Sequence, residues 1–109
     1  MEMNDAITAL TALGHAKRLA IFRLLVAAGP AGRMAGDIGQ ALDLPGATLS
    51  FHLKELLHAG MITAQPQGRF ICYRAEFTAI NGLIGYLTEN CCTDDPATAA
   101  SCPPASACC

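Results

Sequence analysis

Residues 43–63 read DLPGATLSFHLKELLHAGMIT, and this stretch decides the fold. Pro45 suits the first turn of a helix, and Gly60 lies where a glycine commonly ends one. We therefore predict a helix from Pro45 to about His58. One face of this helix is apolar and carries Leu49, Leu53, Leu56 and Leu57. These leucines are expected to pack on a core, which leaves the other face outward.

That outward face has the composition of a contact surface. It carries Ala47, Phe51, Lys54 and His58, flanked by Thr48, Ser50 and Glu55. An outward phenylalanine is unusual on a solvated helix and is explained if the face meets another molecule. The hydroxyls can bond phosphates or base edges, the lysine can meet phosphate or guanine, and the phenyl ring can pack on a thymine methyl group. The alternative is an ordinary amphipathic surface helix, because such spacings also occur by chance.

The residues before this helix predict a shorter partner helix. Ile38 and Leu42 anchor an apolar face in the stretch 35–42, and only the break at 43–45 separates it from the longer helix. Two short helices joined by about three residues are typical of a helix-turn-helix. The longer helix would then be the one that reads DNA.

The residues after Gly60 indicate a hairpin. The pattern shifts toward a period of two, which predicts strands at 61–65 and 69–75 around a turn at 66–68. A hairpin that follows a helix-turn-helix makes the winged arrangement. Arg69 lies at its tip, where a side chain can reach a phosphate or the minor groove. This combination favours the DNA-binding interpretation over a chance amphipathic helix.

Three further helices complete the predicted domain, at about 5–13, 16–28 and 77–90. The first is expected to bury an apolar stripe of Ile7, Leu10 and Leu13. The stripe of the second consists of Leu19, Phe22 and Val26, widened by Ile21 and Leu25. The stripe of the last consists of Phe77, Ile80, Leu83 or Ile84, and Leu87. The last helix also contains Gly82 and Gly85, two residues that disfavour a helix. Their presence is explained if another helix packs closely there, as in a dimer. The expected fold class is mainly α (α+β), a winged helix-turn-helix of about five helices and a two-stranded β-hairpin wing, assembled as a homodimer.

Composition permits one domain and favours the cytoplasm. The chain has 109 residues, 52% of them hydrophobic, and no apolar run approaches the roughly 20 residues of a membrane span. Residues 1–5 carry two acids and no base, unlike a secretory signal. All seven basic residues lie within 17–74, so this part can neutralise phosphates although the whole chain has a net charge of −2. We expect a winged domain at 1–90 and a flexible cysteine-rich tail at 91–109.

Five of the six cysteines lie in the tail, at Cys91, Cys92, Cys102, Cys108 and Cys109. A disulfide framework would instead join cysteines across the core. Two adjacent thiolates and a third at Cys102 can converge on a soft centre with three coordination positions, such as trivalent arsenic or antimony. A tetrahedral zinc site needs a fourth ligand, which Cys108 or Cys109 could supply, so zinc and cadmium stay open. The remaining alternative is a tail whose cysteines have no function.

The sequence contains no motif that indicates an enzyme. No C-x-x-C precedes a helix, no glycine-rich phosphate loop occurs, and the acidic residues are scattered. Cys72 alternates with Ile71 and Tyr73 in a predicted strand, so we expect it to be a buried, inert hydrophobe. No organic cofactor is expected.

Three stretches resemble the ArsR/SmtB family of metalloregulatory repressors: ALGHAKRLAIFRLL at 12–25, DLPGATLSFHLKELLHAGMIT at 43–63 and QGRFICYRA at 67–75. The resemblance covers about residues 7–90. It implies a homodimer joined through its first and last helices, with operator affinity that falls when an effector binds. It also implies DNA contacts at Ser50, Phe51 and His52 and in the wing at Arg69. The helical position of His52, toward the apolar flank, fits a hydrogen-bonded structural histidine equally well.

The resemblance places the effector site in the tail. Many arsenic-sensing members carry C-x-C-x-x-C in the first helix of the helix-turn-helix, but the stretch 33–42 contains no cysteine. The His/Asp pairs of zinc-sensing members are also missing from the last helix, which has no histidine. What remains resembles the subgroup whose arsenic site follows the last helix with adjacent cysteines, as in YLTENCC at 86–92. By that resemblance Cys91 and Cys92 are two arsenic ligands, and Cys102 is the expected third.

The expected function is a transcriptional repressor that binds double-stranded operator DNA as a dimer. Release would follow when As(III) binds the tail thiolates, with Sb(III) or a methylated arsenical as alternative effectors. Three alternatives stay open: a repressor that senses redox state through tail disulfides, a repressor that senses divalent metal ions, and a metal-buffering tail on an inert helical module.

Overall fold

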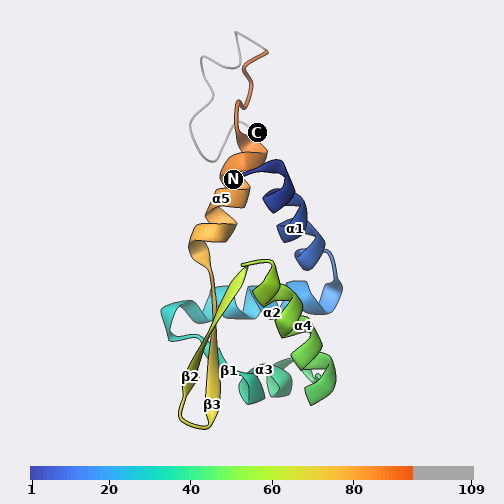
Figure 1. The fold of residues 1–109 in the computed structure, drawn as a ribbon, viewed down its shortest axis with the longest axis vertical. Coiled ribbons are helices and arrows are strands. Elements are labelled where there is room, and N and C mark those ends of the chain that lie inside the picture. The colour runs from blue at the N-terminus through green and yellow to red at the C-terminus, as the bar shows by residue number, and fades with distance from the viewer. Residues whose placement is uncertain (95–109) are drawn as a thin grey trace.

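The computed structural model describes residues 1–94 (Figure 1). These residues form five α-helices, a short 3-10 helix and a small sheet. The elements in chain order are α1 (Met3–Leu13), α2 (Ala16–Ala28), η1 (Gly29–Ala31), β1 (Arg33–Met34), α3 (Ala35–Leu42), α4 (Gly46–His58), β2 (Ile62–Gln67), β3 (Phe70–Ala75) and α5 (Phe77–Thr88). The predicted winged helix-turn-helix is confirmed, and α3 has the predicted bounds. The tail from residue 95 onward lies outside the described residues.

The sheet has three antiparallel strands in the order β1-β3-β2, one more than predicted. β1 pairs Arg33 with Tyr73 and Met34 with Cys72, which ties the start of α3 to the hairpin. A strand of two residues has no periodicity of its own, so only the pairing with β3 reveals it. The strands of the hairpin span 62–67 and 70–75, so its turn is shorter than the predicted turn at 66–68.

The tip of the hairpin is a two-residue turn. Gln67 pairs with Phe70, so only Gly68 and Arg69 connect the strands. Gly68 has φ +63°, and Arg69 is not in the positive-φ region. A positive φ at the first central residue is the geometry of a type II′ turn, which favours glycine there. The turn thus fixes Arg69 at the outermost point of the wing.

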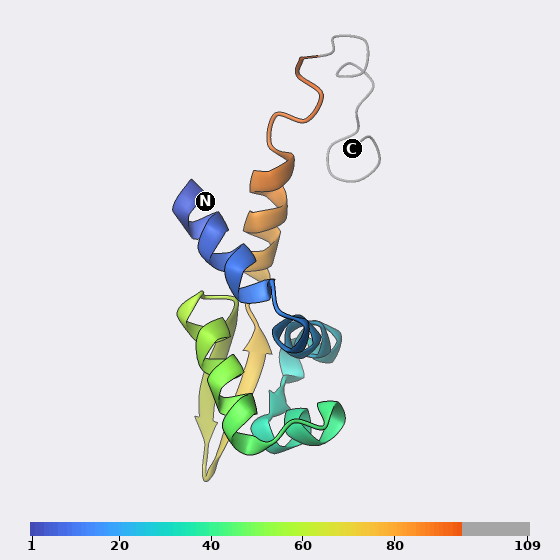
Figure 2. The same cartoon turned by 90° about the vertical axis from the view of Figure 1, so that its right-hand side faces the viewer.

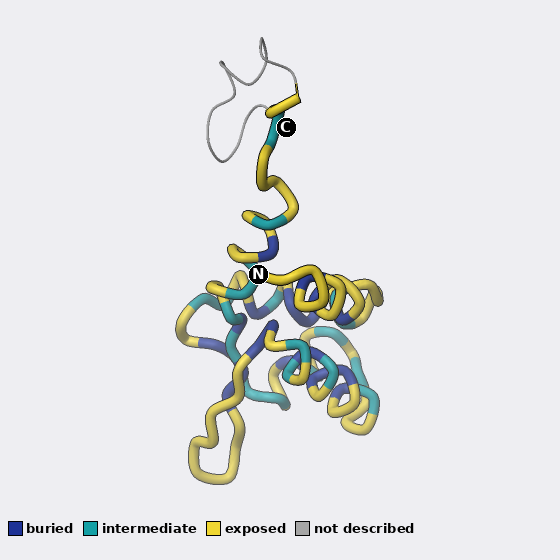
Figure 3. Tube along the Cα trace, turned by 45° about the horizontal axis from the view of Figure 1, so that its top comes forward, coloured by how far each residue is buried: buried dark blue, intermediate teal, exposed yellow. Residues whose placement is uncertain are grey.

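The core lies where α2, α3 and α4 meet the base of the hairpin (Figure 3). Its largest fully buried side chains are Ile21, Leu25, Ile38, Leu56 and Met61. The leucine face of α4 is buried as predicted, with Leu57 only half-buried. Cys72 is 2% exposed, which confirms the prediction of a buried hydrophobe.

The predicted apolar stripe of α1 is wrong. The helix buries Ala6, Ala9 and Ala12, while Ile7 is 52% and Leu10 is 44% exposed. Alanine has almost no side chain to interpose, so an alanine face lets α1 approach the body of the chain closely. The larger apolar side chains then lie on the outer face of the helix.

Two more apolar faces differ from the prediction. α2 buries Ile21, Phe22 and Leu25 and leaves Leu19 and Val26 exposed. α5 ends at Thr88, two residues before the predicted end, and buries Leu83 alone, whereas Ile84 and Leu87 are exposed. α1 and α5 lie beside each other at the end of the molecule opposite the wing tip (Figure 2). In the described part of the chain, no helix is long and apolar enough to cross a membrane.

Candidate DNA-binding surface and thiol pair

A short turn sets the angle between α3 and α4. Asp43 ends α3 with φ +54°, a left-handed conformation that aspartate tolerates better than most residues, and the Leu44 N–H donates to the Gly39 carbonyl at 2.9 Å. A Cβ atom on Gly39 would lie 3.2 Å from the Leu44 oxygen and 3.3 Å from a methyl carbon of Leu49. The missing side chain therefore allows the close approach of the two helices. The helix was predicted to begin at Pro45, but Pro45 is the N-cap residue and α4 begins one residue later, at Gly46.

α4 presents the predicted contact face to solvent. Phe51 is 56% exposed, although the next residue, His52, is buried. Ser50 and Lys54 are exposed beside it, and Thr48 is half-buried at the edge. A hydroxyl, an ammonium group and a phenyl ring thus share one accessible surface, which suits contacts to phosphates and base edges.

His52 does not share that surface. Its side chain is 5% exposed, the one buried polar side chain of the described residues. The Arg18 Nη1 atom lies 3.3 Å from the His52 Nδ1 atom, and the His15 ring centroid lies 4.7 Å from that of His52. This placement favours the interpretation of His52 as a hydrogen-bonded structural histidine, and its role as a DNA contact stays a prediction. The reason is its angular position, which follows the leucine face rather than Phe51.

The wing adds a second accessible region. Arg69 is exposed at the turn, as predicted. Phe70 follows it and is 65% exposed, more than any other large apolar side chain of the described residues. Phe70 was not among the predicted site residues. An aromatic residue next to a hairpin-tip arginine was the available signal, since wings and arms that enter the minor groove use both residue types.

Arg74 holds the wing against the body of the domain. Its Nε donates to the Pro30 carbonyl at 2.7 Å, and its Nη1 donates to the Gln65 Oε1 atom at 2.8 Å. One guanidinium therefore links the η1 turn to both strands of the hairpin. This basic residue is engaged in a structural role, in contrast to the exposed Arg69.

The cysteine pair follows α5 in a hydrogen-bonded turn. Asn90 and Cys92 have φ angles of +61° and +65°, and the Cys91 N–H donates to the Thr88 carbonyl at 3.0 Å. The Sγ atoms of Cys91 and Cys92 lie 3.2 Å apart. This separation exceeds a disulfide bond of about 2.05 Å, so the two sulfurs are close neighbours without being bonded to each other. Both side chains are half-buried.

The third predicted ligand, Cys102, lies outside the described residues, as do Cys108 and Cys109. Within residues 1–94 there is no group of three or more His, Cys, Asp or Glu side chains that could hold a metal ion. The structure therefore brings the sulfur atoms of two of the three predicted ligand residues together, and the third stays a prediction.

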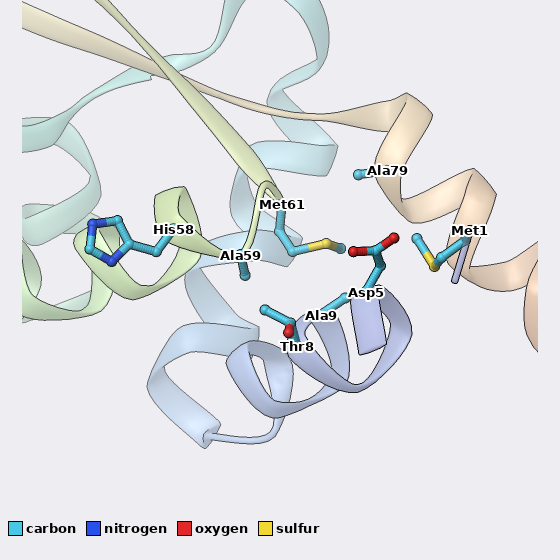
Figure 4. A pocket seen from close by; sticks show the side chains of 8 residues that line it. All are labelled: Met1, Asp5, Thr8, Ala9, His58, Ala59, Met61 and Ala79. Carbon is cyan, nitrogen blue, oxygen red and sulfur yellow. The ribbon is translucent and has the colours of Figure 1, made fainter. Parts of the chain in front are cut away.

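A pocket of about 290 Å³ lies between α1, the end of α4 and the start of α5 (Figure 4). Its lining residues are Met1, Asp5, Thr8, Ala9, His58, Ala59, Met61 and Ala79. Met1, Asp5 and Met61 point toward one another in this pocket, and His58 lies apart from them. The small alanine side chains leave this hollow, so α1 and α5 are incompletely packed within one chain.

The fold and its exposed surface define a winged helix-turn-helix DNA-binding protein. A family model described as a helix-turn-helix domain matches residues 13–65. The HTH-type transcriptional regulator YgaV of Escherichia coli strain K12 is 31% identical over 89 residues, covering 82% of this chain and 88% of that one. The chain belongs to this family of helix-turn-helix transcriptional regulators. These similar proteins are regulators rather than enzymes.

Solved structures show the same fold. An ArsR-like transcriptional regulator from Rhodococcus sp. RHA1 has a TM-score of 0.73 at 24% identity and covers 90% of each chain. HlyU from Vibrio cholerae N16961 has a TM-score of 0.66 at 26% identity, covering 84% of this chain and 99% of that one. The homodimeric winged helix-turn-helix domain Mb0332 from Mycobacterium bovis has a TM-score of 0.65 at 24% identity, with coverage of 81% and 82%. The fold is therefore that of ArsR-like regulators.

Proposed function

We propose that this regulator is a metalloid-responsive repressor. It binds operator DNA as a homodimer and releases it when As(III) binds thiolates of Cys91, Cys92 and Cys102. Sb(III) or a methylated arsenical could bind the same thiolates. The observation that carries the proposal is the 3.2 Å separation of two sulfurs directly after the last helix of a DNA-binding domain.

The dimer would form through α1 and α5. Their outer faces expose Ile7, Leu10, Ile84 and Leu87, an arrangement that is costly for a single chain in water. Gly85 has open space around its Cα, and a Cβ on Gly82 would meet only a methyl group of Met1. A second copy could therefore approach α5 closely. A two-fold dimer of this kind presents two recognition helices about one DNA turn apart.

The donor chemistry of the pair fits a thiophilic metalloid. Thiolates are soft ligands, and in the reduced protein two of them whose sulfur atoms lie as close as 3.2 Å could engage one centre without a large rearrangement of the backbone. A left-handed φ at Cys92 costs a non-glycine residue of the order of 1 kcal/mol, and such strain is often found at functional sites. Cys102 would complete a three-sulfur site.

Metalloid binding would act on DNA through α5. Gathering the three thiols draws the tail toward the end of this helix, which also forms the proposed dimer interface. A coupling of about 1–3 kcal/mol between the two sites would lower operator affinity by several-fold to about a hundred-fold.

The test is fluorescence anisotropy of the reduced protein on its own upstream DNA, titrated separately with arsenite, zinc and peroxide. Tight binding that arsenite alone reverses is the expected result. Reversal by peroxide would instead support redox sensing, and reversal by zinc would support a divalent-metal sensor. Metalloid binding without specific DNA affinity would support the metal-buffering alternative.

A further inference from the structure

One side chain of α2 links the end of α1 to the helix that faces DNA. The Arg18 Nε atom donates to the Ala12 carbonyl at 2.7 Å, and its Nη1 atom lies 3.3 Å from the His52 Nδ1 atom. Ala12 is in the last turn of α1, and His52 is in the middle of α4. A single guanidinium therefore bridges α1 and α4.

The bridge requires a particular protonation state of His52. Arginine has donors and no acceptor, so the Nδ1 atom must accept and the ring proton must be on Nε2. His52 therefore participates as a neutral imidazole. Protonation would replace the acceptor with a second cation beside the guanidinium.

The surroundings of His52 favour that neutral form. Burial lowers the pKa of His52 from its ordinary value of 6.5, and His15, Arg18 and Lys17 lower it further by charge repulsion. Glu55, on the same helix, acts in the opposite direction. Among residues 1–94 these are the charged or titratable groups that shift the pKa of the ring, and α1 contributes the Ala12 carbonyl that accepts from Arg18.

The bridge lies directly behind the DNA-facing side chains. Phe51 is the next residue to His52 and points outward, with an interplanar angle of 64° between the two rings. A shift of the histidine therefore shifts the residues that meet DNA. The His15 ring lies against His52, with 4.7 Å between the ring centroids, and its own Nδ1 accepts the Lys17 N–H at 3.1 Å to cap α2.

We propose that Arg18 is a positioning residue that couples α1 to the recognition helix through neutral His52, so that operator affinity falls when His52 is protonated. The proposal rests on the DNA-binding function of the domain but not on arsenic sensing. Arg18 is half-buried beneath the surface and acts by orienting α4, not by touching DNA.

The first test compares Arg18→Lys with Arg23→Lys. Lysine keeps the charge, but its single ammonium lacks the planar fork that serves both acceptors. We expect Arg18→Lys to lower operator affinity about tenfold relative to an unrelated duplex, the scale of one charge-assisted hydrogen bond. Arg23 lies on the same helix, is exposed, and its side chain makes no hydrogen bond in the described part of the chain, so its variant should leave the affinity ratio unchanged. Equal ratios for both variants would overturn the proposal.

The second test uses pH. The affinity ratio of the wild type should be constant above pH 6.5 and fall several-fold as the pH is lowered below that value, because the lowered pKa of His52 moves the gain of its proton to lower pH. His52→Asn keeps an acceptor near the Nδ1 position without titrating in this range, so its ratio should stay flat. A purely structural His52 would give parallel pH profiles for both proteins, which would contradict the proposal.

The third test needs no variant. Nitrogen-detected NMR of the wild-type imidazoles at pH 7.5 should show His52 neutral with its proton on Nε2. A proton on Nδ1 would exclude the bridge even if the variants fail to fold. If the wild type shows the expected tautomer but binds no operator, the repressor function fails and the bridge stands.

Discussion

Phe51 and His52 are adjacent in α4 but face opposite surroundings, since the phenyl ring is 56% exposed and the imidazole is 5% exposed. The boundary between the DNA-facing surface and the core therefore passes between two consecutive residues. Side chains on one side of it should affect binding, and those on the other should affect stability.

Phe51→Ala is expected to weaken operator binding with little change in the free energy of unfolding. The ring has few partners within the chain, so its loss removes a contact to DNA worth about 1.4 kcal/mol, or tenfold in affinity. Leu53→Ala is the matched control. Leu53 is 3% exposed, and its truncation should cost about 2–5 kcal/mol of stability. Anisotropy and urea unfolding separate the two effects, and unchanged affinity of Phe51→Ala would remove Phe51 from the interface.

Arg69→Ala should weaken binding to all DNA sequences alike. An exposed arginine at the wing tip is placed to neutralise a phosphate, and each lost phosphate contact lowers the slope of log affinity against log salt by about 0.9. A dimer would lose about twice that amount. Salt titrations on operator and unrelated duplexes check this, with Arg69→Lys as the control that keeps the charge. A selective loss on the operator alone would indicate base readout instead.

Cys91→Ser and Cys92→Ser should each retain operator affinity and lose the response to arsenite. The sulfurs follow the DNA-binding domain, so an oxygen in their place removes a soft ligand without altering α4. Cys72→Ala is the control, because Cys72 is buried with its Sγ atom 3.4 Å from the Ala31 carbonyl. Anisotropy with added arsenite measures the outcome. A full response in either serine variant would place the effector site elsewhere.

Leu87→Glu should convert the protein to a monomer. Leu87 is 57% exposed on α5 within one chain, so the change should leave the fold intact and place a charge in the proposed dimer interface. Light scattering coupled to gel filtration gives the mass, and circular dichroism reports the helices. Phe70→Ser alters an equally exposed apolar residue on the wing and should remain dimeric. If Leu87→Glu remains dimeric, the dimer interface does not include this face of α5.

The free energy of unfolding should fall as the pH is lowered through 6.5. His52 has a pKa below 6.5 in the folded protein, so between the two values the unfolded chain binds a proton that the folded chain does not. The slope from this one group is at most about 1.4 kcal/mol per pH unit. Urea unfolding of the wild type and His52→Asn at several pH values isolates this contribution. Identical pH slopes for the two proteins would contradict the lowered pKa.

The helix-turn-helix was predictable from the sequence because its signals are local. The leucine spacing of α4 and the short break after α3 act within a few residues, and α3 and the outward position of Phe51 were predicted correctly. The hairpin followed from its alternation and from Gly68. Helix ends were less accurate, since α5 ends two residues early.

Other features depend on distant parts of the chain. The two-residue strand β1 exists only because β3 lies beside it, and α1 buries its alanines because small side chains permit close approach to the body. The sequence shows both alanines and larger apolar residues on α1, and helical periodicity does not say which face turns inward.

The sequence alone determined the class of protein, the recognition helix and the vicinal pair Cys91 and Cys92, because each depends on residues adjacent in the chain. The tertiary structure alone decided that His52 is buried beside Arg18, that Phe70 is exposed on the wing, and that the two sulfurs lie 3.2 Å apart. These are relations of orientation and distance, which arise when separate elements pack together or when the backbone turns, as it does at Asn90 and Cys92.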